Sequence, residues 1–368
     1  MEKILRCAFP EECTHLHTSD IALILRDPIE ALPDGYGLYC LSSEEYQRFH
    51  DNPNVIETSG ELESGFFISV NTDSKPPEIK VLQTSDIPDR TLFTTGVCNS
   101  NCIMCPYTEY YRVHSGNEPL AKLKRFIELM DPYTDYLCIT GGEPTLLKED
   151  FLELLLAVKN HFQGTLVHIL TNGRTFSYED FVAAYQSVRP YKTLLGIPLH
   201  AGNSVLHDKI SQSPGSFDQT TRGLDFLHRY GEHIEIRIVT SAINKENLPY
   251  LAQVISDRYP NIRHVCFMGL EMMGNSMVNR ADVWCPYSDI MPYVQEASDI
   301  LLEHAIPVQL YNYPLCSVDK KYHTLYRKSI SPWKIVYLPE CEKCRCKEEC
   351  GGFFKTTAVM PDIMVQPY

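Results

Sequence analysis

The sequence predicts an α/β protein with a partial (β/α)6 TIM barrel, a small strand-rich N-terminal domain and a cysteine-rich C-terminal extension. Three observations lead to this prediction. Residues 1–88 hold short apolar runs between turn residues, residues 89–305 repeat a strand followed by a helix, and residues 306–368 are rich in Pro, Cys and Gly. We expect three domains with these boundaries.

The N-terminal domain is predicted from runs that are too short and too alternating for helices. They read ALILRD, GYGLYCLS, GFFISVN and EIKVLQ, and each is bounded by Pro, Gly, Asp or Asn, as strands usually are. The stretch NTDSKPPE at 71–78 is typical of a turn. Residues 1–88 should therefore form a small domain made mainly of strands.

The barrel is predicted from six strand–helix units in a row. The strands read TLFTTG (91–96), YLCITGG, TLVHILTNG, TLLGIPLHAG, HIEIRIVTS and HVCFMGL, and the first helix spans 119–130 and the last about 289–305. Ser177 with Asp180 and Ser216 with Gln219 have the spacing of a capping box. Apolar strands alternating with amphipathic helices indicate a parallel sheet covered by helices. Six units fall short of the eight of a closed barrel, so we expect an open one.

Composition narrows the class of protein. The formal charge of −14 argues against nucleic-acid binding, which needs a basic surface. No stretch approaches the ~20 apolar residues of a membrane span, and the first residues lack a signal-peptide core. A cytoplasmic protein without a membrane partner is the expectation. The 14 cysteines are too many for an ordinary enzyme of this size, and without a secretory signal they favour metal or cluster ligation over disulfides.

Three of these cysteines, Cys98, Cys102 and Cys105, lie in the loop after the first predicted barrel strand. Active sites of parallel α/β sheets lie at this end of the strands. Thiolates suit iron–sulfur clusters, and three ligands would leave one iron of a cubic cluster open to a small molecule. The alternative is a zinc knuckle, but structural zinc needs four ligands and only His114 follows within fifteen residues.

A second motif, TGGEPT at 140–145, follows the second predicted strand at the same end of the barrel. Gly141 and Gly142 would let the backbone approach a ligand closely, and the Glu143 carboxylate could receive an amine.

With CxxxCxxC after the first strand and GGEPT after the second, the sequence resembles the radical S-adenosylmethionine (SAM) superfamily. The resemblance implies a [4Fe–4S] cluster held by Cys98, Cys102 and Cys105, with an open iron that binds the amine and carboxylate of SAM. It also implies that one electron cleaves SAM to a 5′-deoxyadenosyl radical, which abstracts hydrogen from a substrate. An electron donor such as flavodoxin or ferredoxin would be a partner.

Further residues match the superfamily by position. Tyr107, two residues after the last cysteine, would lean on the adenine, and Asn172 follows the third strand. His200 ends the fourth strand, where many relatives carry Ser or Asp near the ribose, so the sequence departs from the pattern there. Arg237, in the fifth strand, would meet the methionine carboxylate. An ordinary salt bridge or hydrogen bond at a strand end is the alternative for Arg237 and His200.

The C-terminal extension carries four cysteines within CEKCRCKEECGGFF at 341–354. This segment resembles the auxiliary-cluster extensions, of SPASM or twitch type, of peptide-modifying radical enzymes. The preferred ligands of a second [4Fe–4S] cluster are Cys316, Cys341, Cys344 and Cys350; the competing set replaces Cys316 with Cys346. We prefer the first set because Cys344 and Cys346 would point to opposite faces of an extended backbone. Structural zinc is the alternative to a cluster.

A finer resemblance combines YNYPLC, SISPWK, YLPECEKC and CGGFF with LFTTGVCNSNCIMCP. Together these are similar to the HxsC-type radical maturases of the His-Xaa-Ser peptide systems. The resemblance implies a precursor peptide or protein with His-Xaa-Ser repeats as substrate and a second radical SAM maturase as partner. Two alternatives stay open: a radical SAM enzyme acting on a small molecule or tRNA, and a non-catalytic iron–sulfur protein for electron transfer or sensing.

Overall fold

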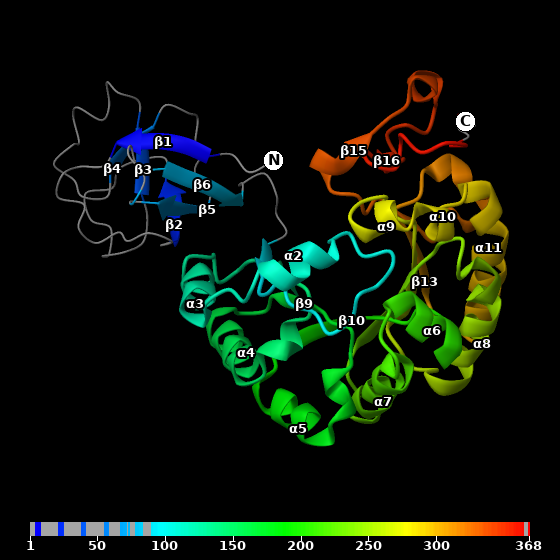
Figure 1. The fold of residues 1–368 in the computed structure, drawn as a ribbon, viewed down its shortest axis with the longest axis horizontal. Helices are drawn as coiled ribbons and strands as arrows, with labels where there is room; N and C mark the ends of the chain where they lie inside the picture. The colour runs from blue at the N-terminus through cyan, green and yellow to red at the C-terminus, as the bar shows by residue number, and fades with distance from the viewer. Residues whose placement is uncertain are drawn as a thin grey trace. The chain divides into compact units, whose positions relative to one another are not determined.

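A computed structural model of the chain describes residues 90–363 and 367–368 in full, and Asp73 and six strands within the first 89 residues (Figure 1). The chain divides into two compact units. One comprises residues 1–92, 118–137 and 153–165, and the other comprises residues 93–117, 138–152 and 166–368. All the cysteines and other site residues predicted from the sequence lie in the second unit.

The strands of the N-terminal segment form a closed barrel in the order β1-β4-β3-β2-β5-β6. Ile68 and Val70 alternate with the less buried Ser69 along β5, and Ile79 of β6 is also fully buried. The predicted strand-rich character is therefore confirmed, although the predicted turn at 71–78 falls largely outside the described residues. The strands are β1 (Ile4–Ala8), β2 (Ile21–Leu25), β3 (Leu38–Leu41), β4 (Val55–Thr58), β5 (Phe67–Asn71) and β6 (Glu78–Gln83).

The central sheet has eight strands in the order β14-β13-β12-β11-β10-β9-β8-β7 and is open, with β7 and β14 at its edges. The pairings between neighbouring strands from β9 to β14 are all parallel. All six predicted strands are present, and two more, β13 and β14, extend the sheet into the C-terminal segment. The strands are β7 (Arg90–Phe93), β8 (Tyr136–Thr140), β9 (Leu166–Leu170), β10 (Lys192–Pro198), β11 (Ile234–Val239), β12 (His264–Met268), β13 (Val308–Tyr311) and β14 (Tyr326–Arg327).

Helices connect successive strands from β7 to β13, as the alternating pattern predicts, and the longer helices bury apolar side chains on one face. Within the described residues none is long and apolar enough to cross a membrane. The helices are α2 (Glu109–His114), α3 (Leu120–Glu128), α4 (Glu149–His161), α5 (Glu179–Val188), α6 (Ser204–Ser211), α7 (Ser216–Arg229), α8 (Leu248–Arg258), α9 (Asn275–Val278), α10 (Arg280–Val283) and α11 (Tyr287–Glu303).

Neither predicted capping box forms. Helix α7 begins at Ser216 itself, with Gly215 in the N-cap position at φ 79°, and the Ser216 hydroxyl donates to Asp208 Oδ1 (2.9 Å). Helix α5 has Tyr178 as its N-cap, without a side-chain capping bond. Both serines lie one residue from the position that the spacing requires, because tight turns precede the two helices.

The C-terminal segment ends in a short antiparallel pair, β15 (Ile335–Val336) and β16 (Phe353–Phe354). The loop between these strands carries the cysteines at 341–350. Phe353 is almost fully buried and Phe354 is buried as well, so the base of this loop is packed into the protein.

Candidate functional site

A cavity of about 280 Å³ lies at the carboxyl ends of the central strands. The loops that follow β7, β8, β9 and β10 all contribute to its lining, as expected for an open parallel barrel. The site residues predicted from the sequence that line it are Cys98, Cys102, Cys105, Tyr107, Gly141, Gly142, Asn172, His200 and Arg237. Residues from five separate segments of the chain therefore meet in one place.

The three cysteines share this cavity and are partly buried. Burial raises the pKa of the Cys98 thiol to about 11, and the Glu143 carboxyl raises it further. Burial raises the pKa of Cys102 to about 12, with the charges of Cys105 and Cys98 acting in the same direction. Cys98 and Cys102 resist ionisation without a partner cation, and with Cys105 they form a set of three sulfur donors whose thiolates a shared cationic metal would neutralise, because the metal replaces their protons. The residues present therefore fit a metal cluster.

Backbone groups shape the cysteine loop. The Ser100 N–H donates to Cys98 Sγ (3.4 Å), and the Cys105 N–H donates to the Cys102 carbonyl (3.0 Å) in a tight turn. The Asn172 side chain donates to Asn99 Oδ1 (2.6 Å) and lies 4.0 Å from Cys98 Sγ. These contacts fold the loop around its sulfur atoms.

Two arginines hold the loop, and the sequence reasoning missed both. Arg112 of α2 is buried, and it donates to the Tyr107 carbonyl (3.1 Å) and to Asn101 Oδ1. Its charge lowers the pKa of Cys98 and Cys102, opposing the larger effect of burial. A single Arg inside EYYRVH gives no signal in the sequence that distinguishes it from a surface residue.

The second is Arg174, which follows β9. Its Nη1 donates to Ser100 Oγ (2.9 Å), to Ser213 Oγ (2.9 Å) and to the Asn99 carbonyl. Arg174 therefore ties the cysteine loop to the segment between α6 and α7. Its position two residues after Asn172, in the loop already singled out, was the signal that could have found it.

The loop after β12 holds the cysteine loop from another side. Asn275 donates through its backbone N–H to the Cys105 carbonyl (2.9 Å) and through its side chain to the Cys102 carbonyl (3.1 Å). Gly274, at φ 60°, passes so close to Pro106 that an added Cβ would lie 2.2 Å from the Pro106 carbonyl oxygen. Only glycine fits this close approach.

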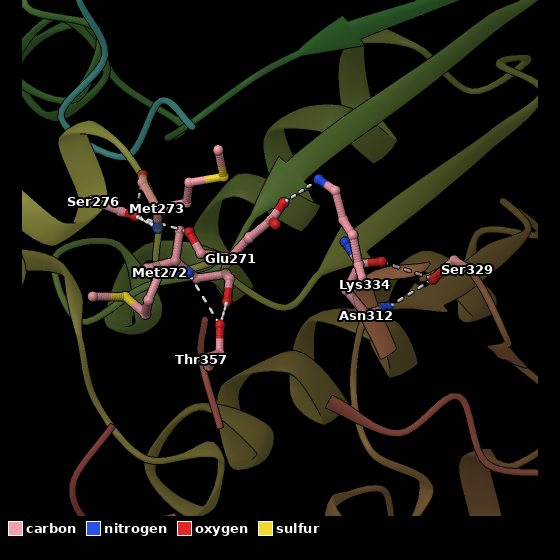
Figure 2. Close-up of polar contacts among 9 residues, drawn as sticks. Glu271, Met272, Met273, Ser276, Asn312, Ser329, Lys334 and Thr357 are labelled. Atoms are coloured by element: carbon pink, nitrogen blue, oxygen red, sulfur yellow. Dashed lines mark hydrogen bonds and ion pairs between the residues drawn. The ribbon is translucent and has the colours of Figure 1, made fainter. Parts of the chain in front are cut away.

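The same loop also contacts the C-terminal segment (Figure 2). Glu271 pairs with Lys334, just before β15, at 2.9 Å. The Met272 N–H donates to Thr357 Oγ1 (3.0 Å), just after β16. Both ends of the segment that carries the C-terminal cysteines are therefore anchored on the loop that braces Cys102 and Cys105.

The glycine pair packs against the cysteine loop itself. An added Cβ on Gly141 would lie 2.5 Å from the Thr95 carbonyl oxygen, and one on Gly142 would lie 2.2 Å from that of Val97. The Gly142 N–H donates to the Thr95 carbonyl (2.6 Å). Both glycines line the cavity, so their backbone is open to a ligand on one side while it contacts this loop on the other.

The structure gives Glu143 a different position from the predicted one. Its carboxylate is fully buried, does not line the cavity, and accepts hydrogen bonds from the Thr145 hydroxyl (2.6 Å), the Thr171 hydroxyl (2.6 Å) and the Asn172 N–H (2.5 Å). Burial raises the pKa of Glu143, and these bonds oppose the shift. Glu143 therefore holds the loop after β9 through these hydrogen bonds.

Arg237 reaches the cavity from a polar layer buried inside the barrel. It pairs with Oε1 of Glu235, a residue of the same strand. Glu235 Oε1 also lies 3.9 Å from His168 Nε2, and Glu235 Oε2 lies 2.8 Å from His264 Nε2. Burial alone would raise the pKa of Glu235, but the His264 hydrogen bond and the charge of Arg237 lower it to about 2. The ion pair that was the alternative for Arg237 is thus present, and Arg237 lines the cavity as well.

Acid is expected to destabilise the barrel through His168. Burial lowers the pKa of His168 to about 4, from 6.5. Between these values the unfolded chain binds more protons than the folded one, so the free energy of unfolding falls as the pH drops from 6.5 to 4, by up to about 3 kcal/mol. Urea unfolding at pH 7 and pH 4.5 measures this loss. The His168→Gln variant should lose less stability than the wild type over the same interval, and an equal loss would contradict the assignment.

A second pocket gathers all five C-terminal candidate cysteines: Cys316, Cys341, Cys344, Cys346 and Cys350. Cys350 Sγ accepts N–H bonds from Leu315 and from Gly352, both at 3.3 Å. Cys344 itself has an extended backbone, but the chain turns from Cys346 on, where the Cys350 N–H donates to the Cys346 carbonyl (3.1 Å). Because Cys344 and Cys346 line the same pocket, their one-residue spacing alone does not set Cys346 apart, and both ligand sets stay open.

Residues 92–257 match the profile of the Radical SAM superfamily. This match agrees with the prediction from the two motifs.

The chain is also similar to curated proteins. It is 26% identical over 175 residues to the AdoMet-dependent heme synthase of Methanosarcina barkeri (strain Fusaro / DSM 804), covering 47% of this chain and 48% of the relative. It is 24% identical over 235 residues to the antilisterial bacteriocin subtilosin biosynthesis protein AlbA of Bacillus subtilis (strain 168), covering 62% and 49%. The chain spans about half the length of these curated relatives.

Among solved structures, Streptococcus suis SuiB has a TM-score of 0.49 at 15% identity, covering 66% of this chain and 53% of SuiB. The protein anSMEcpe with bound AdoMet has a TM-score of 0.48 at 16% identity, covering 60% and 63%.

Proposed function

We propose that this protein is a radical SAM enzyme that reductively cleaves SAM and modifies a ribosomally made peptide or protein of the His-Xaa-Ser type. The observation that carries the proposal is the convergence of Cys98, Cys102 and Cys105 on one cavity, within a segment of the radical SAM superfamily. Three thiols there hold a [4Fe–4S] cluster and leave one iron for SAM.

Different residues around the cavity would bind different parts of SAM. The backbone of Gly141 and Gly142 would face the methionine end of SAM, Arg237 would pair with its carboxylate, and Tyr107 would cover the adenine. When bound and reduced, the cluster would supply the electron for reductive cleavage of SAM, and the 5′-deoxyadenosyl group would then take hydrogen from the substrate. The protein would orient SAM, and the largely apolar walls of the cavity would limit the access of water to the reaction.

The second group of cysteines supports a peptide substrate. The pocket of Cys316, Cys341, Cys344, Cys346 and Cys350 offers enough thiols for an auxiliary [4Fe–4S] cluster, and such extensions are typical of peptide-modifying radical enzymes. The similarity to AlbA, a bacteriocin biosynthesis protein, points the same way. A flavodoxin- or ferredoxin-like donor and a second radical maturase are the partners that this function needs.

A second candidate is a radical SAM enzyme acting on a small molecule. The similarity to AdoMet-dependent heme synthases favours it. The acidic charge of −14 argues against tRNA as the substrate. A non-catalytic iron–sulfur protein is disfavoured, because a cavity for SAM beside the three thiols has no purpose in electron transfer alone.

Deuterium transfer distinguishes these candidates. The reconstituted protein is incubated anaerobically with SAM, dithionite and a precursor peptide whose His-Xaa-Ser repeat is deuterated. Deuterium in the 5′-deoxyadenosine, with a change in peptide mass, is the expected result. Unlabelled 5′-deoxyadenosine with unchanged peptide would favour the small-molecule candidate. No 5′-deoxyadenosine at all would favour the non-catalytic one.

Glu143→Ala is expected to weaken SAM binding although Glu143 does not line the cavity. The change removes the acceptor of the Thr171 hydroxyl and of the Asn172 N–H and so loosens a loop that lines the cavity. Losing charge-assisted hydrogen bonds of this kind costs about 1.5–3 kcal/mol, or roughly 10–150-fold in the Kd for SAM. Calorimetric titration measures the Kd. Glu149→Ala, at an exposed position at the start of α4, is the matched control and should bind SAM normally. An unchanged Kd for Glu143→Ala would remove Glu143 from this role.

A further inference from the structure

His200 lies against a cysteine of the proposed cluster. It follows the carboxyl end of β10, is buried, and lines the cavity. Its Nε2 is 3.9 Å from Cys102 Sγ, within the range of a hydrogen bond to sulfur. Among the described residues, Cys102 is the cavity cysteine whose sulfur lies within hydrogen-bond distance of a histidine.

Hydrogen bonds to both backbone groups of His200 hold the residue in place. Its N–H donates to His207 Nδ1 (3.2 Å), and its carbonyl accepts from Asn244 Nδ2 (3.1 Å). The His200 and His207 rings lie 5.1 Å apart. Because the backbone is held and the ring is enclosed, Nε2 stays directed at the sulfur.

The proton on Nε2 follows from what each atom can accept. Within the described part of the chain, His200 Nδ1 has no hydrogen-bond partner and no contact with solvent. A cysteine that ligates a metal is a thiolate and can only accept a hydrogen bond. An imidazole nitrogen facing it must therefore be the donor. The Nε2 nitrogen is the donor whether the His200 ring is neutral or charged.

We propose that His200 Nε2–H donates a hydrogen bond to Cys102 Sγ and thereby raises the reduction potential of the cluster that binds SAM. Hydrogen bonds to ligand sulfur atoms stabilise the more negatively charged, reduced cluster and so move its potential upward. The inference rests on the proposed function, because it needs the cluster. It gives His200 a tuning role in place of the ribose contact suggested by its position at the end of the fourth predicted strand.

Two variants separate the hydrogen bond from the bulk of the ring. His200→Gln keeps an N–H donor near the position of Nε2, whereas His200→Leu fills similar space without a donor. The midpoint potential of each reconstituted protein is measured by redox titration followed by electron paramagnetic resonance. Loss of one hydrogen bond should lower the equilibrium constant for cluster reduction by roughly two- to tenfold in His200→Leu. A tenfold change equals 59 mV for a one-electron couple. The Gln variant should stay close to the wild type.

Three results would overturn the inference: an unchanged potential in His200→Leu, an equal shift in both variants, or a shift to higher potential. A measurement on the unmutated protein guards against variants that lose the cluster. With 15N-labelled histidine, pulsed resonance of the reduced cluster should show one weakly coupled histidine nitrogen, and its absence would also overturn the inference. A wild-type protein that binds no cluster would instead overturn the proposed function itself.

Discussion

Replacing Cys98, Cys102 and Cys105 together by Ala should leave reconstituted protein with about half its iron and no formation of 5′-deoxyadenosine. The wild type should bind close to eight irons, as two [4Fe–4S] clusters, because the structure gathers the candidate ligand cysteines into two separate pockets. Of these two pockets, the one that Cys98, Cys102 and Cys105 line is the cavity proposed for SAM. The rate of SAM cleavage should therefore fall to the level of free dithionite, while the second cluster remains.

Iron analysis and chromatography of the reaction products measure both effects. Cys138→Ala, in β8 and outside both pockets, is a matched control that should keep all its iron and its activity. A triple variant that retains all the iron of the wild type would refute the ligand assignment. Zinc in place of iron in the C-terminal pocket would refute the auxiliary cluster and leave the first assignment intact.

The second large effect concerns the ligands of the auxiliary cluster. Cys316→Ala should lose that cluster or leave it sensitive to oxygen, whereas Cys346→Ala should keep it. Five thiols line the pocket and a cubic cluster has four irons, so one thiol is surplus. Cys350 accepts a hydrogen bond from Leu315, the residue before Cys316, so the segment of Cys316 is already docked against a ligand. The single-residue spacing of Cys344 and Cys346 no longer excludes Cys346, so this docking now carries the preference.

Electron paramagnetic resonance of the two variants decides between the ligand sets. In Cys316→Ala the first cluster should still form 5′-deoxyadenosine, while modification of the peptide fails. Loss of the second signal in Cys346→Ala together with its survival in Cys316→Ala would reverse the assignment.

The fold could be predicted from the sequence where the pattern is local. Each of the six predicted strands, for example HIEIRIV, is apolar and precedes a helix, and each forms. The two extra strands escaped prediction because β13 has only four residues and β14 only two, and no α-helix follows either within the described residues. Strand β13 joins the sheet by pairing with β12, and β14 joins it by pairing with β13; these long-range contacts leave no period in the sequence.

The residues of the candidate site that belong to recognisable motifs could be predicted from the sequence. Chemistry and spacing identified the three cysteines and the glycine pair, and all of them line one cavity. The direction of a side chain is a different matter. Glu143 turns away from the cavity because Thr145, Thr171 and Asn172 offer it hydrogen bonds, and only the folded backbone brings these groups together. Arg112 was missed for the same reason, since its contacts exist only once the cysteine loop has closed.

Whether this protein is a radical SAM enzyme is decided by the formation of 5′-deoxyadenosine. Anaerobically reconstituted protein is mixed with SAM and dithionite, and the nucleoside is quantified over time. We expect 5′-deoxyadenosine and methionine to form in equal amounts. Their formation should depend on dithionite and should be absent in the variant lacking Cys98, Cys102 and Cys105. SAM that stays intact in protein carrying a reduced [4Fe–4S] cluster would contradict the claim.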